Sequence, residues 1–397
     1  MILKMPQTRE EVGESNRRRV LAEILFHGPI ARAKIANRVR LTQATVSRIT
    51  RDLIKAELIE EGEVIDESNR RGRRFIGLRI NPTGRFVAGI SINVFRQNIT
   101  IADLANGIIA TKRLQLKKMS DPSYVLSQSS EALSILIEEH DIDSSRIVGC
   151  GVIITGSMNP KDCMVHRSSL LGWDNVSVTA HMQPYLDFPV FLDSIPNAKN
   201  ITARGYGVAK GCNNVALLNA SLAFGCSLIV DGHLLRGAQF VSGMVGEMLV
   251  PDEKGELISL DDCAGGFAVV ASRFGKTTTS GHTRGQRLVD IIALANKGDE
   301  NAISALEKAG SCLAFAISNI SALLRPELML LSGPLIHSEH YCSAVKKRVI
   351  ELLGAEFSKQ SLRFYLVSDQ EAACSLALYQ SLTFGHMTNE VRSREVA

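Results

Sequence analysis

Apolar residues recur at helical spacing in three short segments near the start of the chain. The pattern predicts helices over residues 16–26, 31–38 and 43–55. In the first of these helices the apolar side chains stand at positions i, i+1, i+4 and i+5: Val20, Leu21, Ile24 and Leu25. The pair Gly28-Pro29 ends this helix, because neither residue continues a helical backbone well. These segments are therefore expected to form a small helical unit.

The third predicted helix has one narrow apolar face and one polar face. The apolar residues, which we expect to be buried, are Val46, Ile49, Leu53 and Ile54. The opposite face carries hydroxyl, amide and guanidinium groups, from Gln43, Thr45, Ser47, Arg48 and Arg51. Such groups pair with base edges and phosphates, so the helix is predicted to read a DNA major groove. We assign base contacts to Gln43, Thr45 and Arg48, and phosphate contacts to Thr42, Ser47 and Arg51.

A strand-like segment with a basic turn follows the third helix. Val64-Ile65 and residues 75–80 predict the two strands of a hairpin. Its tip carries arginines around a glycine, and we expect wing contacts to DNA from Arg71, Gly72, Arg73 and Arg74. Three helices packed together without DNA would leave these arginines unexplained. Residues 1–81 are therefore predicted to form a winged helix-turn-helix that binds double-stranded DNA.

From residue 82 onward the chain alternates strands and helices. The first predicted elements are strands over 86–92 and 98–103, a type I′ turn at Asn106-Gly107, a strand from Ile108, a helix over 123–140 and a buried strand over 147–154. The order recurs loosely, with strands over 215–219 and 226–230, a helix over 302–324 and a strand over 328–331. This pattern predicts an α/β fold of two lobes with a cleft between them.

Composition places the chain among ordinary globular proteins. It has 397 residues, of which 45% are hydrophobic, and a mean hydropathy of +0.07. No apolar run reaches the about 18 residues of a membrane span, and no signal-peptide pattern is present, so we expect a cytoplasmic protein without a membrane partner. The eight cysteines stand singly with no C-x-x-C pair, which favours reduced thiols over disulfides or a zinc ribbon.

Charge is unevenly placed along the chain. Residues 1–86 contain 18 Lys and Arg against 11 Asp and Glu, a net charge of +7, whereas the remainder carries −3. A solvated basic face is the common alternative cause of such asymmetry. Together with the predicted helix and hairpin, however, it fits one module that meets phosphates and a remainder that does not.

Several motifs together resemble the regulators of the ROK family, which groups repressors, open reading frames and sugar kinases. The motifs are Gly72-Arg73-Arg74, Leu171-Gly172-Trp173, Val230-Asp231-Gly232-His233-Leu234-Leu235-Arg236-Gly237-Ala238, Gly243-Met244-Val245-Gly246-Glu247-Met248, and Arg325-Pro326-Glu327 before Ser332-Gly333. The resemblance covers essentially the whole chain. It implies an actin-like, ribonuclease-H-like two-lobed domain that binds a sugar in its cleft, to which the kinases of the family add ATP. We expect one lobe over 82–196, with a C-terminal helix 370–397 packing back on it, and a second lobe over 197–369.

The chain departs from the kinase pattern of the family at three places. Residues 91–95 lack the glycine and carboxylate of the first phosphate loop, and residues 221–225 place Leu222 and Phe224 in the second. Ile195 stands where the resemblance places the aspartate that acts as general base, and isoleucine cannot accept a proton. We therefore expect no catalytic residue, no nucleotide cofactor and no enzyme activity.

The zinc site that the resemblance implies is also incomplete. Glu247 replaces the zinc histidine, residues 251–262 contain no cysteine, and Cys263 is alone. A structural zinc site needs four ligands, so no metal is expected there.

Polar residues remain where the resemblance places the sugar pocket. Asn197, Glu247 and Asp261 are the candidate effector-binding residues, because amides and carboxylates pair with neighbouring hydroxyls. Alternatively, these side chains cap or pair within a degenerate core. Trp173 is expected in the core rather than as a stacking platform for a sugar.

The expected function is that of a transcriptional repressor that senses a carbohydrate effector without phosphorylating it. One recognition helix covers only about 4–5 bp, so a homodimer or homotetramer should read half-sites about 10 bp apart, or a multiple of that, in its operator. Two alternatives stay open at this stage. The ROK domain is regulated by a protein partner, or the protein is an active ATP-dependent sugar kinase.

Overall fold

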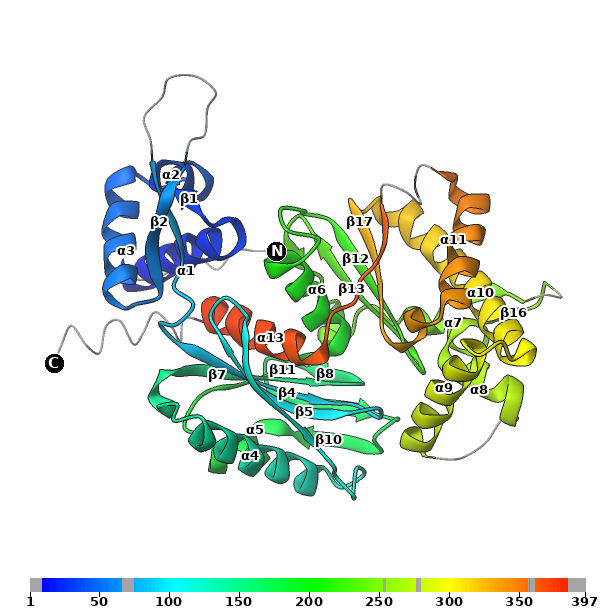
Figure 1. The fold of residues 1–397 in the computed structure, drawn as a ribbon. Helices are drawn as coiled ribbons and strands as arrows, with labels where there is room; N and C mark the ends of the chain where they lie inside the picture. Colours follow the sequence, from blue (N-terminus) through cyan, green and yellow to red (C-terminus); the bar gives the residue numbers. More distant parts are fainter. Residues whose placement is uncertain are drawn as a thin grey trace.

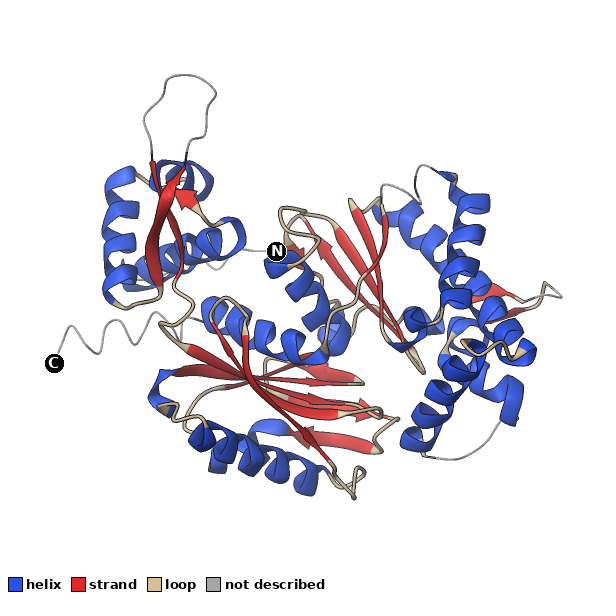
Figure 2. Ribbon diagram, in the orientation of Figure 1, coloured by secondary structure: helices blue, strands red, loops and turns tan. Residues whose placement is uncertain are grey.

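In the computed structural model, a small N-terminal head stands beside two larger lobes (Figure 1). The structure describes residues 9–65, 75–252, 255–275, 280–355, 357 and 361–384. Both lobes combine β-sheets with helices, as Figure 2 shows.

The head consists of three helices and a three-stranded antiparallel sheet of order β1-β3-β2. Its elements are α1 (Arg9–His27), β1 (Ile30–Ala31), α2 (Arg32–Val39), α3 (Gln43–Lys55), β2 (Ile59–Ile65) and β3 (Phe75–Ile80). This arrangement confirms the predicted winged helix-turn-helix. α1 begins seven residues earlier than predicted, because residues 9–15 are mostly charged or small and give no apolar periodicity. The predicted wing-tip residues Arg71, Gly72, Arg73 and Arg74 lie outside the described residues.

The buried face of α3 differs slightly from the predicted one. Val46, Ile49 and Leu53 are buried as expected, but Ile54 is only half-buried. The fourth buried side chain is the polar Thr50, which is fully covered. A buried hydroxyl requires a hydrogen-bond partner, and the Thr50 hydroxyl donates to the Ser47 carbonyl of the same helix at 3.2 Å.

The first lobe is built on a five-stranded sheet of order β11-β7-β4-β5-β6. Its strands are β4 (Phe86–Ile92), β5 (Gln97–Asp103), β6 (Ile108–Leu114), β7 (Ile147–Ile154) and β11 (Val190–Ser194). Strands β4, β5 and β6 are antiparallel, whereas β4, β7 and β11 run parallel. Helices α4 (Pro122–Glu139) and α13 (Asp369–Phe384) lie on opposite faces of this sheet (Figure 1). A smaller sheet and a short helix complete the lobe: β8 (Ser157–Asn159), β9 (Met164–Ser168), β10 (Trp173–Ser177) and α5 (Val178–Met182).

The second lobe repeats this strand pattern in the order β14-β13-β12-β17-β18. Its strands are β12 (Val215–Ala220), β13 (Phe224–Val230), β14 (His233–Leu234), β17 (Leu328–Ser332) and β18 (Leu362–Phe364). Again the first three strands are antiparallel and β12, β17 and β18 are parallel. The recurrence expected from the sequence is therefore confirmed.

Helices and a hairpin surround the second sheet. They are α6 (Ile195–Tyr206), β15 (Leu249–Pro251), β16 (Leu257–Ser259), α7 (Leu260–Ala264), α8 (Gly266–Phe274), α9 (Gly281–Ala295), α10 (Glu300–Leu324) and α11 (Glu339–Leu353). Among the helices in the described part of the chain, none is long and apolar enough to cross a membrane.

The turn between β5 and β6 is not the predicted two-residue type I′ turn. A type I′ turn needs positive φ at both central residues, but only Asn106 has one (φ 65°) and Gly107 does not. The chain instead turns through residues 103–106, where the Asn106 amide donates to the Asp103 carbonyl. Asp103 Oδ1 accepts from the Gly107 amide at 2.7 Å and stabilises this wider turn.

The head is joined to the first lobe by a shared core as well as by the chain. Val20 and Leu21 of α1 belong to the same hydrophobic cluster as Val148 of β7 and Leu378 of α13. Trp173 is buried, as expected, and its indole Nε1 donates to the Met119 carbonyl at 2.8 Å. All eight cysteines are free thiols.

Candidate functional site

The polar face of α3 points to solvent in the head. Gln43, Arg48 and Arg51 are exposed, and Thr45 and Ser47 are half-buried. Neither Arg48 nor Arg51 forms an ion pair with any residue that the structure describes. Their guanidinium groups are thus available to base edges and phosphates, and each offers a planar array of donors for bidentate pairing.

Thr42 has a structural role that the sequence did not reveal. It is the N-cap of α3, and its hydroxyl oxygen accepts a hydrogen bond from the Thr45 amide at 3.2 Å. The two threonine hydroxyls also lie 2.8 Å apart and share a hydrogen bond. Thr42 and Thr45 therefore stabilise the start of the recognition helix, whatever contact they make with DNA.

Arg32 connects the recognition helix to the wing. From the start of α2, its Nε donates to Thr50 Oγ1 of α3 at 3.1 Å, and its Nη2 lies 2.8 Å from Glu61 Oε1 of β2. The buried Thr50 hydroxyl thus accepts from Arg32 and donates to the Ser47 carbonyl. In the sequence, the available signal for this contact was the polar Thr50 on the apolar face of the helix. That signal did not identify Arg32 as its partner.

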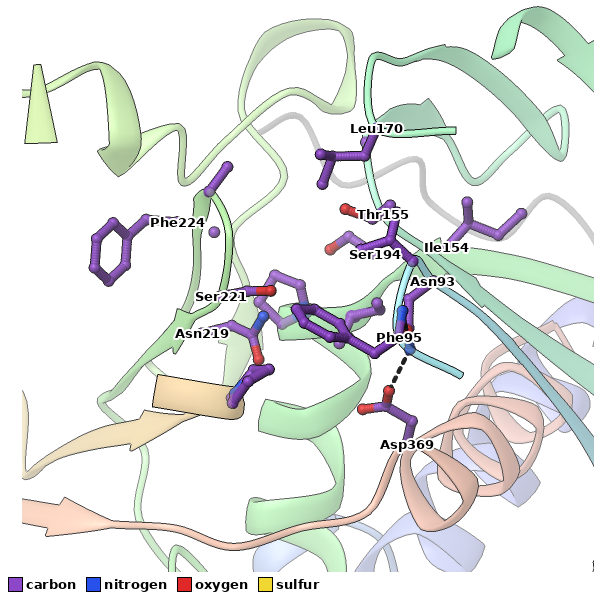
Figure 3. A pocket seen from close by; sticks show the side chains of 18 of the residues that line it. Asn93, Phe95, Ile154, Thr155, Leu170, Ser194, Asn219, Ser221, Phe224 and Asp369 are labelled. Carbon is purple, nitrogen blue, oxygen red and sulfur yellow. Dashed lines mark hydrogen bonds between the residues drawn. The ribbon is translucent and has the colours of Figure 1, made fainter. Parts of the chain in front are cut away.

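A large cleft separates the two lobes. Its volume is about 1520 Å³, above the about 300–1,000 Å³ typical of small-molecule sites. Figure 3 shows Thr155, Ser194 and Leu170 on one wall and Asn219, Ser221 and Phe224 on the other. Hydroxyl and amide groups thus face each other across the cleft, with apolar side chains between them. Such a lining suits a ligand that has both hydroxyl groups and an apolar ring face.

Two of the three predicted effector residues line this cleft. Glu247 and Asp261 do so, and Glu247 is exposed to it. Asn197 does not line it: its side-chain amide donates to Asp193 Oδ1 at 2.8 Å. Asp193 is fully buried and its other oxygen lies 2.6 Å from Arg236 Nη1. The structure therefore places Asn197 in a buried polar cluster, and its contact with an effector stays a prediction.

Asp261 is the acid with the most perturbed environment in the cleft. Its Oδ1 accepts from the Phe224 amide at 2.7 Å. The pKa of the Asp261 carboxyl is raised to about 6: burial is the main cause, the Phe224 hydrogen bond opposes the rise, and the charges of Asp262 and Glu247 contribute to it. A carboxyl with a pKa this close to neutrality changes its charge readily when a ligand binds.

The floor of the cleft is a network centred on a buried lysine. Lys199 Nζ of α6 lies 3.0 Å from Asp369 Oδ1 of α13 and 3.3 Å from Asn219 Oδ1 of β12. Asp369 Oδ2 accepts in turn from Asn93 Nδ2 at 2.7 Å, drawn as a dashed line in Figure 3. Sequence reasoning missed Lys199 and Asp369, because residues so far apart in the chain share no local pattern.

The turn after β4 folds back on itself. The amides of Phe95 and Arg96 both donate to Asn93 Oδ1, at 2.8 and 2.9 Å. On the facing lobe, His282 Nδ1 of α9 donates to the Val94 carbonyl at 2.9 Å. The two lobes therefore touch where the sequence analysis placed the first phosphate loop of the kinases.

Near Glu247 and Cys263 no metal site is formed by the residues described. In that part of the chain, no three His, Cys, Asp or Glu side chains are grouped closely enough to hold an ion.

Comparison with known proteins matches both parts of the chain. A profile of the ROK family matches residues 87–376, and a profile of the MarR family matches residues 15–71. The chain is 26% identical over 353 residues to the xylose repressor of Bacillus subtilis strain 168, across 87% of this chain and 90% of the relative. It is 22% identical over 323 residues to the DNA-binding transcriptional dual regulator NagC of Escherichia coli K12, across 79% of each chain.

Solved structures share the fold. A ROK family transcriptional regulator, a homolog of the E. coli MLC protein, superposes with a TM-score of 0.74 at 20% identity, over 96% of this chain and 99% of that one. A ROK family glucokinase from Streptomyces griseus, in complex with glucose and AMPPNP, superposes with a TM-score of 0.59 at 17% identity, over 74% of this chain and 98% of the glucokinase. With the profile match extending over most of its length, the chain belongs to the ROK family and carries a MarR-like winged-helix head in front of the two-lobed domain.

Proposed function

We propose that the protein is a transcriptional repressor whose two-lobed domain binds a sugar or sugar derivative without phosphorylating it. The observation that carries this proposal is the combination, in one chain, of an exposed guanidinium face on α3 with a polar cleft holding Glu247 and Asp261. The names of two relatives, the xylose repressor of Bacillus subtilis and an N-acetylglucosamine repressor of Escherichia coli O6:H1 that is 22% identical over 323 residues, support a sugar as the effector. We place the protein in the cytoplasm, where the DNA that it binds lies.

The absence of phosphoryl transfer is the finer part of the proposal. A phosphate loop binds its anion through free backbone amides, but the Phe95 and Arg96 amides already donate to Asn93. In addition, the side chain that begins α6 is Ile195, which is buried and cannot act as a base. These contacts support a sensor rather than a kinase, although kinases share its fold.

We propose that two or four copies act together. A single α3 helix reads only about 4–5 bp, so a homodimer or homotetramer is needed to reach two half-sites separated by about one helical turn, or a multiple of it. Base contacts are assigned to Gln43, Thr45 and Arg48, and backbone contacts to Ser47 and Arg51 with Thr42 at the helix start.

The test begins with the DNA that the purified full-length protein retains from its genome, which is sequenced to identify the operator. Operator affinity is then measured by fluorescence anisotropy with and without D-xylose, N-acetylglucosamine and D-glucose. We expect at least one sugar to weaken operator binding and to stabilise the protein by about 2.7 kcal/mol at about 100 times its dissociation constant.

Three results would contradict the proposal. Retention of DNA without sequence preference would exclude a specific repressor. Transfer of phosphate from ATP to any of the sugars would establish a kinase. If no carbohydrate shifts the melting temperature, a protein partner becomes the regulator of the domain.

A further inference from the structure

Two helices extend from the cleft to the DNA-binding head. α6 begins with Ile195 and Pro196, and α13 begins with Asp369; all three residues line the cleft. Both helices also contact α1 of the head. In Figure 1, α13 lies between the sheet of the first lobe and the head, with α6 beside it. The two helices pack against each other along the way.

At the cleft end, an ion pair ties the two helices together. Lys199 is 5% exposed and its Nζ lies 3.0 Å from Asp369 Oδ1. Lys199 also reaches Asn219 in the second lobe, and Asp369 reaches Asn93 in the first. A change in the angle between the lobes therefore has to strain or break a contact of this pair. Because Lys199 is buried, loss of its charged partner is costly.

At the head end, Arg204 of α6 stacks on Phe26 of α1. The guanidinium carbon is 5.1 Å from the ring centroid. Gly205 presents its backbone to the same ring, where a Cβ would lie 3.4 Å from Phe26. Next to this stack, Lys210 Nζ donates to the Gly28 carbonyl at 3.4 Å. The segment at the end of α6 thus packs against the end of α1.

Residues of the second lobe hold the Arg204 side chain in place. Its Nε donates to the Cys212 carbonyl at 3.2 Å, and a Cβ on Gly232 would lie 2.9 Å from its Nη2. The small void beside it, shared with Tyr379, has a volume of about 10 Å³, at the lower limit of the about 10–15 Å³ that a water needs. With so little free space, a displacement of α6 has to move the Phe26 ring.

We infer that Arg204 is the positioning residue through which the cleft controls the orientation of the DNA-binding head. The inference rests on the proposed function, because it concerns how an effector in the cleft changes operator affinity. Ligand contact at the start of α6 shifts a helix of 12 residues, about 18 Å long, as one piece. Arg204 passes this shift to Phe26, and α1 turns the recognition helix that packs on it.

The first experiment uses full-length wild type and the variants Arg204→Met and Phe26→Leu. Operator affinity is measured with and without D-xylose and N-acetylglucosamine, and sugar affinity is measured separately by calorimetry. In both variants we expect sugar affinity to stay within about twofold, while the sugar-induced change in operator affinity falls from the about 5- to 150-fold typical of coupled sites to below about twofold.

Three controls separate coupling from damage. Phe26→Tyr keeps the ring and should keep the response. Arg273→Met removes an arginine of α8 that pairs with Asp299, and it should also keep the response. Melting curves show whether the variants fold. If Arg204→Met does not fold, the comparison of Phe26→Leu with Phe26→Tyr tests the inference. A wild-type response in both Arg204→Met and Phe26→Leu would overturn the inference.

A second experiment needs no sugar, so it decides the inference even if neither sugar binds and the proposed function fails. Asp369→Asn breaks the ion pair at the cleft end. Hydrogen exchange of residues 20–27 is compared for this variant, for Arg204→Met and for the double variant. We expect Asp369→Asn to speed exchange in the head in the wild-type background and to add nothing in the Arg204→Met background, because coupled residues are not additive. If Asp369→Asn speeds the exchange of residues 20–27 equally in both backgrounds, the inference is overturned.

Discussion

The amide of Phe224 donates a hydrogen bond to Asp261 Oδ1 across 2.7 Å, which attaches the carboxylate of α7 to the first residue of β13. One oxygen of this carboxylate is thereby used within the protein. The other oxygen has no protein donor among the described residues and is available for a hydroxyl of a ligand.

Sugar affinity is therefore expected to depend on pH through Asp261. Burial raises the pKa of this carboxyl from 3.8 to about 6, so its contribution to stability is complete below 3.8 and is lost as pH rises through about 6. The ionised form is the better acceptor for a sugar hydroxyl. Between pH 5 and pH 7 we expect sugar affinity to rise about tenfold, measured by calorimetry, because the ionised fraction changes by that factor.

The matched control is Asp261→Asn, which keeps the shape and the acceptor oxygen but does not titrate. Its sugar affinity should be weaker at pH 7 and flat between pH 5 and pH 7. A wild-type affinity that does not change over this range would show that Asp261 does not touch the ligand.

Arg48 is expected to carry sequence specificity in the head. Its side chain is exposed on α3 and pairs with no described residue. Arg48→Ala should weaken operator binding by about 1–3 kcal/mol and relax the preference at one base position, whereas Arg51→Ala should weaken all sequences alike and lower the salt slope by about one. Anisotropy titrations at several salt concentrations measure both quantities. Operator binding by Arg48→Ala as tight as that of wild type would refute the assignment.

Thr42 is expected to contribute to stability as well as to binding. Its hydroxyl caps α3 by accepting from the Thr45 amide. Thr42→Ala should destabilise the head by about 1 kcal/mol, within the about 0.5–2 kcal/mol of known caps, and Thr42→Ser should restore most of it. Hydrogen exchange in residues 43–48 reports this loss directly. Unchanged exchange in Thr42→Ala would mean that the cap contributes nothing.

The contact between the head and the two lobes is expected to weaken at acidic pH because His27 becomes protonated. Burial lowers the pKa of His27 below 6.5, nearby Arg38, Arg204 and Lys210 lower it further, and Glu23 opposes them. Because the folded pKa is depressed, the neutral imidazole stabilises the fold above pH 6.5, and this stability is lost as pH falls from 6.5 through the folded pKa. After correction for the intrinsic effect of pH, hydrogen exchange of α1 should therefore be faster at pH 5.5 than at pH 7.5.

His27→Gln provides the control for this effect, since glutamine is polar but does not titrate. Its α1 exchange, corrected for the intrinsic effect of pH, should be the same at both pH values. The same pH response in His27→Gln as in wild type would assign the effect to another group.

Much of the fold followed from local patterns. The three helices of the head, the wing strands and the repeated strand order all arise from apolar periodicity, which is a property of neighbouring residues. The predictions were wrong where local apolar periodicity does not determine the local structure. Residues 9–15 are helical without a periodic stripe, and Asn106-Gly107 turns differently because the Asp103 side chain accepts from Gly107.

The candidate site was predictable only in part, for a similar reason. Residue type and helical spacing were enough to select Arg48 on α3, whereas Asp261, which lines the cleft, was selected through the resemblance to the ROK family. Residue type was not enough for Asn197, whose amide is bound to Asp193, or for Thr42, whose hydroxyl serves as a cap. Residue type does not reveal which partner a polar group takes.

By itself, the sequence determined the class of protein: a basic helical head that binds DNA, followed by two α/β lobes. These features depend on composition and on spacing along the chain. Only the tertiary structure decided that Lys199 pairs with Asp369 and that Arg204 stacks on Phe26. Those contacts join segments distant in the chain, and a side chain finds such a partner only when packing has placed the two elements side by side.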